Sequence, residues 1–220
     1  MKDIPELLSQ IRKVLRGKIW DTIAVQNKEG DITRYTIQII DWTNKDLTGE
    51  IIEEKTLEKK SKEISLLIAM PNKWDKAELI IQKLTEIWIN EIIFRPAERS
   101  IITQWNEKKA ERLLKIAQEA TEQSRGTQIP NISFCKNIAS ITEGKKVYVF
   151  DKGGTHISPI ANKANPSLSE EELYGIIWPE GGLTEKDYKN FKEYEVLWLG
   201  NNVLRMETAA IIGSWILRNS

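Results

Sequence analysis

Apolar, strand-like runs alternate with amphipathic segments from residue 64 onwards, and this alternation limits the possible folds more than any other feature. The runs with the length and composition of buried strands are Ile64–Met70, Ile92–Phe94, Val147–Phe150, Gly175–Trp178 and Val196–Leu199. The segments in which apolar residues recur at helical spacing are Asp75–Trp88, Asn106–Ser124 and Met206–Leu217. Strands that alternate with helices predict a parallel sheet with helices on both faces, which is an α/β fold.

The first part of the chain has a different pattern. Ile19–Val25, Tyr35–Ile40 and Leu47–Ile52 are rich in β-branched and aromatic residues and predict short strands, with a hairpin turn at Asn27–Gly30. We therefore expect a small β domain over residues 1–64 and an α/β domain over residues 65–220. The charged segment Glu53–Glu63 between them is either a solvated connector or a basic edge that faces RNA.

Charge and metal-binding residues exclude several classes of protein. The chain has 32 basic and 32 acidic side chains, so its overall charge gives no reason to expect nucleic acid. Any RNA-binding surface must come from local clusters. Cys135 and His156 are the only residues of their kinds, which excludes an internal disulfide and a His/Cys zinc site, and no metal is expected. The stretch 152–166 around His156 is typical of a loop, which does not favour a catalytic role for this histidine.

Targeting and membrane segments are not evident in the sequence. The N-terminus has no apolar stretch of signal-peptide length, and no apolar run approaches the ~20 residues that cross a bilayer. We expect a soluble, cytoplasmic protein without a membrane partner.

Two glycine-containing loops follow the last two predicted strands, at Pro179–Thr184 and Gly200–Ala209. Ligands of parallel sheets bind beyond the carboxyl ends of the strands, and glycine lets the backbone approach a ligand closely. The spacing of Thr184 and Asp187 predicts a capping box at the start of a helix. Each loop could equally be an ordinary turn. Neither a dinucleotide-binding fingerprint nor a phosphate-binding loop motif is present.

These loops carry a resemblance to a known family. Pro179–Glu185 and Leu199–Ala209 resemble the two cofactor loops of the ribosomal RNA small subunit methyltransferase E family. Further segments that resemble the family, in the same order along the chain, are Val14–Arg16, Lys83–Glu86, Pro96–Ser100 and Glu119–Arg125. The resemblance implies a PUA-like RNA-binding β-barrel domain, shortened at its N-terminus, followed by a trefoil-knotted α/β domain of the SPOUT type. It also implies a homodimer that uses S-adenosylmethionine to methylate N3 of a uridine in the 16S rRNA of the small ribosomal subunit.

The resemblance also assigns roles to residues. It implies that the cofactor is bound by Ile177, Trp178, Pro179, Glu180, Gly181, Gly182, Leu199, Gly200, Asn201, Val203, Leu204, Thr208 and Ala209. Arg205 is expected to stabilise the negative charge that develops on the uracil ring, with Glu180 or Glu207 orienting it or taking the proton. Arg205 and Glu207 could instead form a structural pair. The candidate RNA-binding residues are Arg12, Arg16, Arg99, Ser100, Gln123 and Arg125.

Four tryptophans depart from the family pattern, because Trp20, Trp74, Trp88 and Trp178 stand where the family has glycine. We expect them to share no packing role. One hypothesis is that the gene uses UGA as a glycine codon and that these residues are glycines in the natural protein. If the tryptophans are genuine, Trp178 is expected to obstruct the cofactor loop. Independently of these tryptophans, the alternatives to the uridine-N3 methyltransferase are a non-catalytic RNA-binding or ribosome-assembly relative that retains the fold, or a knotted methyltransferase for another nucleotide, for example in tRNA.

Overall fold

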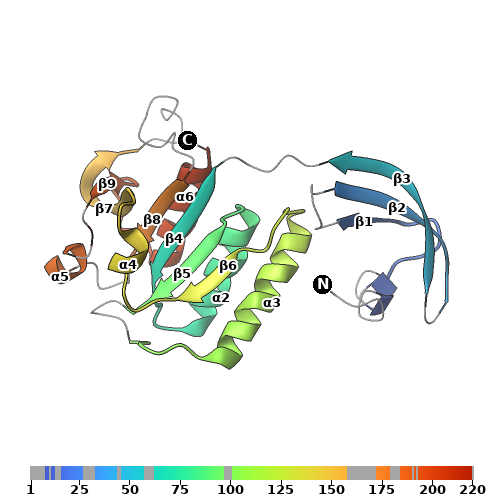
Figure 1. Cartoon of the computed structure of the whole chain (residues 1–220), viewed down its shortest axis with the longest axis horizontal. Coiled ribbons are helices and arrows are strands. Elements are labelled where there is room, and N and C mark those ends of the chain that lie inside the picture. Colours follow the sequence, from blue (N-terminus) through green and yellow to red (C-terminus); the bar gives the residue numbers. More distant parts are fainter. Residues whose placement is uncertain are drawn as a thin grey trace. The chain divides into compact units, whose positions relative to one another are not determined.

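The computed structural model describes residues 8–9, 11–12, 16–26, 33–43, 46–56, 62–96, 101–157, 172–178, 184–189, 191 and 193–219. The chain divides into two compact units, Met1–Lys59 and Lys60–Ser220, each with its own sheet (Figure 1). Within the described ranges, no helix combines the length and the apolar character needed to cross a membrane.

The first unit contains a three-stranded antiparallel sheet in the order β1-β2-β3. Its strands are β1 (Thr22–Gln26), β2 (Thr33–Trp42) and β3 (Leu47–Thr56). Antiparallel pairing of β1 with β2 is what a hairpin requires, although the predicted turn at Asn27–Gly30 lies outside the described residues.

β3 is longer than the sequence predicts. It continues through Glu53 to Thr56, so these residues belong to a strand and the prediction of a connector is wrong for them, whereas the alternative of a basic edge that faces RNA stays a prediction. The physical reason is pairing with β2, which begins early enough for Thr33 to face Thr56. The hydroxyl of Thr36 also donates a hydrogen bond to Oε2 of Glu53 at 3.0 Å. Cross-strand pairing therefore keeps a charged and exposed segment extended.

The second unit contains a six-stranded sheet in the order β6-β5-β4-β8-β7-β9, and each neighbouring pair of strands is parallel. Its strands are β4 (Glu63–Ala69), β5 (Glu91–Arg95), β6 (Asn131–Phe134), β7 (Val147–His156), β8 (Glu172–Ile177) and β9 (Tyr194–Trp198). The predicted parallel α/β fold is confirmed.

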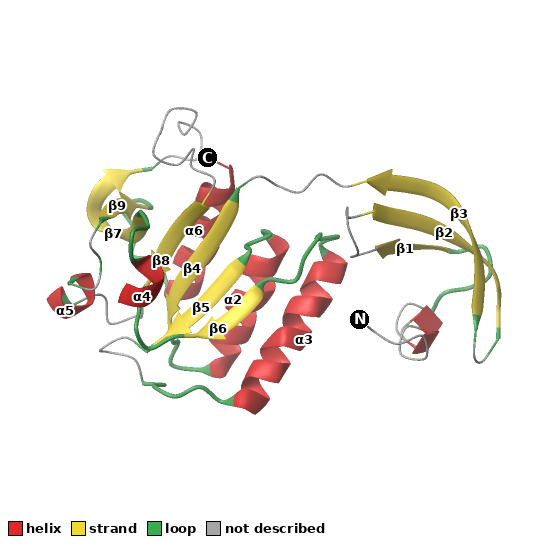
Figure 2. Ribbon diagram, viewed as in Figure 1, coloured by secondary structure: helices red, strands yellow, loops and turns green. Residues whose placement is uncertain are grey.

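Helices cover this sheet, as Figure 2 shows. They are α2 (Trp74–Glu86), α3 (Glu107–Gln123), α4 (Ala139–Thr142), α5 (Glu185–Tyr188) and α6 (Met206–Asn219). Because successive side chains of a strand point to opposite faces, Leu66 packs in the larger core with Ile80 and Leu217, whereas Leu67 packs in a smaller cluster with Phe191. The larger core holds α2, α3 and α6 against one face of the sheet.

β7 also extends further than predicted, through residues 152–156 of the stretch expected to be a loop. After an irregularity that follows Phe150, Thr155 pairs with Leu197 of β9. Gly154 makes this possible, because a Cβ atom there would lie 2.2 Å from the carbonyl oxygen of Val196. The loop prediction is therefore wrong for 152–156. Residues 158–166 lie outside the described part of the chain.

Two of the four unexpected tryptophans have a left-handed backbone. Trp20 has φ 77° and Trp88 has φ 66°, a region that glycine adopts readily and that other L-residues disfavour. Trp88 is the residue after the C-cap of α2. Its N–H donates to the Thr85 carbonyl, and the N–H of Ile89 donates to the Leu84 carbonyl. This hydrogen-bond pattern is the Schellman motif, in which this position is usually glycine.

The other two tryptophans have packing partners. The ring centroids of Trp74 and Trp105 are 5.9 Å apart, and those of Trp178 and Phe191 are also 5.9 Å apart. Trp178 is 7% exposed. Trp74 packs against the larger core and Trp178 lies in the smaller cluster, so the two tryptophans share no packing environment.

Candidate functional site

The carboxyl edge of the six-stranded sheet brings together the segments after β4, β8 and β9. Because the strands are parallel, their carboxyl ends meet at one edge, where ligands of such sheets bind. The chain leaves β4 into α2, and it leaves β9 through residues 199–205 into α6. This edge is the candidate site.

Gly200 gives the β9–α6 segment its backbone conformation. Its φ is 124°, which an L-residue disfavours, and a Cβ atom placed on it would meet no described atom within 4 Å. Among the described residues nothing obstructs this backbone, so it can approach a ligand closely. After it, Asn201 and Val203 are exposed, and Val203 is 78% exposed. The segment thus presents both backbone and apolar surface.

The remaining cofactor residues predicted on this segment lie beside it. Leu199 and Leu204 are half-buried, and so are Thr208 and Ala209 in the first turn of α6. The N–H of Ala209 donates to the Arg205 carbonyl at 2.8 Å. The segment and the start of α6 therefore form one continuous candidate surface.

The β8 side contributes Ile177 and Trp178. Both side chains are buried, Ile177 in the larger core and Trp178 in the smaller cluster. Nε1 of Trp178 is buried, and its N–H donates to no acceptor among the described residues. The predicted cofactor residues that lie outside the described part of the chain are Pro179, Glu180, Gly181 and Gly182.

The first turns of α2 and α6 contribute a lysine and a glutamate. Nζ of Lys76 lies 3.8 Å from Oε2 of Glu207, and the two side chains are 29% and 12% exposed. Arg205, the expected partner of Glu207, is exposed. Lys76 is not among the site residues predicted from the sequence. The sequence feature that could have identified Lys76 is its position in the first helical turn after the apolar strand β4.

The start of α5 confirms the predicted capping box. The Thr184 hydroxyl accepts from the Asp187 N–H, and the Asp187 carboxylate accepts from the Thr184 N–H. Asp187 also forms a buried ion pair with Arg95 at the carboxyl end of β5, at 2.9 Å. Arg95 was not among the predicted site residues, because no local pattern links it to Asp187.

The candidate RNA-binding residues are spread over both units. In the first unit, Arg12 donates a hydrogen bond to the Thr43 carbonyl, and its guanidinium lies 5.1 Å from the ring centroid of Trp42. Arg16 is exposed and has φ 50°. Arg99 and Ser100 lie outside the described residues.

Gln123 and Arg125 lie at the other edge of the second unit's sheet. Gln123 ends α3, and both residues precede β6 and are exposed. A helix between parallel strands runs back towards the amino ends of the strands, so these residues lie opposite the candidate site in the same chain.

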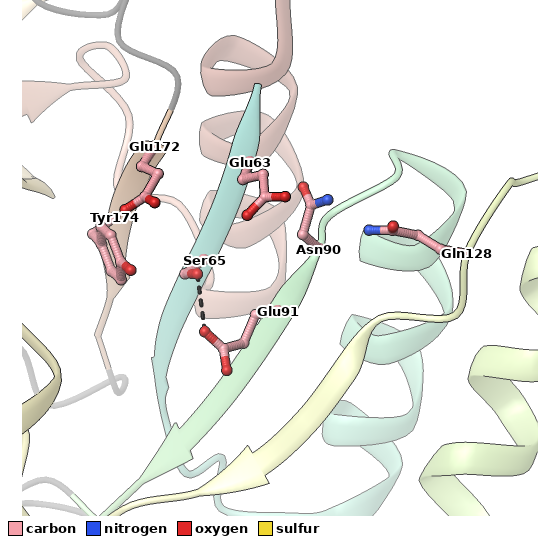
Figure 3. A pocket seen from close by; sticks show the side chains of 7 residues that line it. All are labelled: Glu63, Ser65, Asn90, Glu91, Gln128, Glu172 and Tyr174. Atoms are coloured by element: carbon pink, nitrogen blue, oxygen red, sulfur yellow. Dashed lines mark hydrogen bonds between the residues drawn. The ribbon is translucent and has the colours of Figure 1, made fainter. Parts of the chain in front are cut away.

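A pocket of about 300 Å³ opens at this amino edge, between the first residues of β4, β5 and β8 (Figure 3). Glu63, Glu91 and Glu172 line it. Oε2 of Glu91 accepts from Ser65 at 3.0 Å. Carboxylates repel phosphate groups, so the pocket does not suit the nucleic-acid backbone, and the carboxyl edge remains the candidate site.

Comparison with known proteins identifies the family of this chain. Residues 58–217 match the RNA methyltransferase domain family. The chain is 29% identical over 220 residues to ribosomal RNA small subunit methyltransferase E of Bacillus subtilis (strain 168), with 94% of this chain and 84% of the relative covered. It is 28% identical over 208 residues to the protein of the same name from Rickettsia conorii, with 91% and 82% covered.

A solved structure shows the same fold. The crystal structure of ribosomal RNA small subunit methyltransferase E from Neisseria gonorrhoeae, bound to S-adenosyl methionine, has a TM-score of 0.78 and 20% identity. The similarity covers 97% of this chain and 89% of that one. The family match spans almost all of the second unit, and the curated relatives extend the similarity into the first. The chain belongs to the RNA methyltransferase family of ribosomal RNA small subunit methyltransferase E.

Proposed function

We propose that this chain transfers a methyl group from S-adenosylmethionine to N3 of one uridine in 16S rRNA of the small ribosomal subunit. The names of the curated relatives support rRNA as the substrate class, and the bound cofactor of the Neisseria gonorrhoeae protein supports the methyl donor. The observation in this chain that carries the proposal is the segment after β9. There Gly200 opens the backbone to a ligand, and Arg205 is exposed just before α6.

The domain roles follow from the same proposal. Residues 1–64 form the RNA-binding domain, of a PUA-like kind, and residues 65–220 form the methyltransferase domain, in which the cofactor loops belong to a trefoil knot. The active form is a cytoplasmic homodimer.

The residues at the carboxyl edge fit a nucleoside cofactor. Concave cofactor sites combine apolar walls with a few backbone polar groups, and the described residues that would provide them are Ile177, Trp178, Leu199, Gly200, Asn201, Val203, Leu204, Thr208 and Ala209. Pro179, Glu180, Gly181 and Gly182 complete the proposed set. When bound, S-adenosylmethionine supplies an electrophilic methyl group on a sulfonium.

The side chains of the protein act on the uracil. N3 becomes nucleophilic only as its proton leaves, and the resulting negative charge spreads onto the neighbouring carbonyl oxygens. Arg205 is exposed and always charged, so it stabilises this charge as a fixed cation. Glu207 lies beside Lys76 with a buried carboxylate oxygen, which suits a role in positioning the start of α6. The other predicted carboxylate, Glu180, is then the candidate proton acceptor.

RNA contacts are divided between the two edges of the sheet. Arg205 serves the target uridine at the carboxyl edge. Arg99 and Ser100, which lie outside the described residues, are candidate phosphate contacts. Gln123 and Arg125 lie at the amino edge, so they contact RNA further from the target or meet the partner subunit. Arg12 and Arg16 serve the RNA-binding domain.

Transfer of labelled methyl groups tests the proposal. Unmodified small ribosomal subunits are incubated with the protein and methyl-labelled S-adenosylmethionine, and label in 16S rRNA is counted. Arg205→Ala is expected to lower the rate by about 100-fold, with Arg205→Lys intermediate, because a fixed charge is lost from the transition state. Lys83→Ala, which removes a half-buried pair with Glu86 within α2, is the control. Cofactor binding without transfer would favour the non-catalytic relative.

A further inference from the structure

A buried ion pair joins the carboxyl end of β5 to α5. Nη2 of Arg95 lies 2.9 Å from Oδ1 of Asp187, and the side chains are 7% and 5% exposed. The two residues are 92 positions apart in the sequence. The pair therefore fixes the distance between two elements that are remote along the chain.

The same carboxylate closes the first turn of α5. Oδ2 of Asp187 accepts hydrogen bonds from the backbone N–H of Thr184 at 3.2 Å and from its hydroxyl at 3.1 Å. One oxygen thus binds Arg95 and the other binds the N-cap residue. Because α5 has only four residues, it depends on such contacts for its stability and its position.

A second hydrogen bond attaches α5 to a different strand. The hydroxyl of Tyr188 donates to Oδ2 of Asp151 in β7 at 2.9 Å. In the sheet order, β4 and β8 lie between β5 and β7. The two attachments of α5 therefore bracket the carboxyl ends of β4 and β8, where the candidate site lies.

The ion pair is poorly built for stability alone. Nε and Nη1 of Arg95 are buried, and neither donates to an acceptor within the described ranges. Burying charges is costly, and apolar replacements of buried pairs are often no less stable. A buried pair of this kind is better suited to holding α5 in one position relative to β5.

We propose that Arg95 is a positioning residue of the cofactor site. Through Asp187 it fixes Thr184 and the first turn of α5, whose two attachments lie on either side of the carboxyl ends of β4 and β8. The inference rests on the proposed function, which assigns the carboxyl edge of the sheet to S-adenosylmethionine. Arg95 acts through Asp187 and does not touch the reacting atoms.

Removal of the pair is expected to weaken cofactor binding more than turnover. If α5 keeps its position beside the site only a tenth of the time without the pair, the apparent Kd for S-adenosylmethionine rises about tenfold. The variants are Arg95→Met and Asp187→Asn in the full chain. Asp187→Asn keeps the side-chain shape and covers the case in which Arg95→Met does not fold. Arg112→Met, which removes a surface ion pair between α3 and Glu78 of α2, is the matched control.

The experiment combines calorimetric titration with S-adenosylmethionine and hydrogen exchange at the amides of residues 185–188. The proposal predicts a Kd about tenfold higher, a similar rise in KM with little change in kcat, faster exchange in α5, and partial recovery in Arg95→Lys. Unchanged Kd and unchanged exchange in a folded variant would overturn it. If the unaltered chain does not bind S-adenosylmethionine, the proposed function fails, and the exchange rates alone decide whether Arg95 positions α5.

Discussion

The guanidinium of Arg218 donates a hydrogen bond to the backbone carbonyl of Trp88, which ties the end of α6 to the turn after α2. Arg218 also donates to the Lys62 carbonyl at 2.6 Å and to Oδ1 of Asn90 at 2.8 Å. Its side chain is 9% exposed, and burial lowers its pKa from the ordinary value. The Arg218 guanidinium thus donates to one oxygen just before β4 and to two oxygens just before β5.

Arg218→Met is expected to lower the free energy of unfolding of the second unit. It leaves buried oxygens without their charged donor, a loss of about 3 kcal/mol. Urea unfolding measures the change. Arg112→Met, at an arginine that is 64% exposed, is the control and should have little effect. Equal effects of the two substitutions would show that the Arg218 contacts contribute no more than a surface pair.

Trp88→Gly is expected to raise the free energy of unfolding. The left-handed backbone costs an L-residue about 1–2 kcal/mol, while glycine costs about 0.5–1 kcal/mol in conformational entropy. A net gain of about 0.5–1 kcal/mol should appear in urea titrations. Trp198→Gly is the matched control, since Trp198 lies in the extended strand β9, and it should lose about 3 kcal/mol. A similar loss for Trp88→Gly would contradict the argument.

Trp20→Gly tests the same reasoning in the first unit. Trp20 has φ 77° and is 67% exposed, and it lies in the turn that Asp21 closes on Lys18. Positive φ in a turn favours glycine, and little apolar burial is lost with the side chain. Melting of the first unit should therefore shift to higher temperature, and a downward shift would argue against a glycine position.

The codons of the gene decide the recoding hypothesis directly. UGG at positions 20, 74, 88 and 178 would end it, and UGA at all four would establish it. The backbone at Trp20 and Trp88 favours glycine, whereas the aromatic contacts of Trp74 and Trp178 are compatible with tryptophan.

The contact between Lys76 and Glu207 is expected to support catalysis more than stability. Glu207→Gln removes the negative charge that attracts Lys76 of α2 to the first turn of α6. Misplacement of this first turn of α6 should slow methyl transfer roughly tenfold. The rate at saturating cofactor and the urea midpoint are measured together. Lys83→Ala, on α2 like Lys76, is the control. An unchanged rate would remove Glu207 from the proposed site.

Tyr188 is expected to make stability fall at alkaline pH. Burial, and then the hydrogen bond to Asp151, raise the pKa of its hydroxyl. The stabilisation is fully present below the ordinary tyrosine pKa of about 10, and it is lost as the pH rises, because the unfolded chain releases the proton first. Urea midpoints of the chain and of Tyr188→Phe should converge above about pH 10. A difference that does not depend on pH would contradict this assignment.

Local patterns predicted much of the second unit. Apolar runs gave most of its parallel strands, and the spacing of Thr184 and Asp187 gave a capping box whose reciprocal hydrogen bonds are present. These features depend on neighbouring residues, which a sequence displays directly.

Contacts between distant residues were not predictable in the same way. β6 has only four residues, too few for a clear period. The extension of β7 depends on Gly154 passing close to Val196 of β9. At the candidate site, Lys76 and Arg95 are notable because they pair with residues on other elements, and no local sequence pattern predicts such pairs.

Nucleoside mass spectrometry tests the central claim most directly. Two proteins are compared, the chain with tryptophan at positions 20, 74, 88 and 178 and a variant with glycine at these positions. Each is incubated with S-adenosylmethionine and unmodified small ribosomal subunits, and the 16S rRNA is then digested to nucleosides. N3-methyluridine is the predicted product, with a higher yield from the glycine variant if the recoding hypothesis holds. Its absence with both proteins, when each is folded and a known enzyme methylates the same subunits, would contradict the proposed reaction.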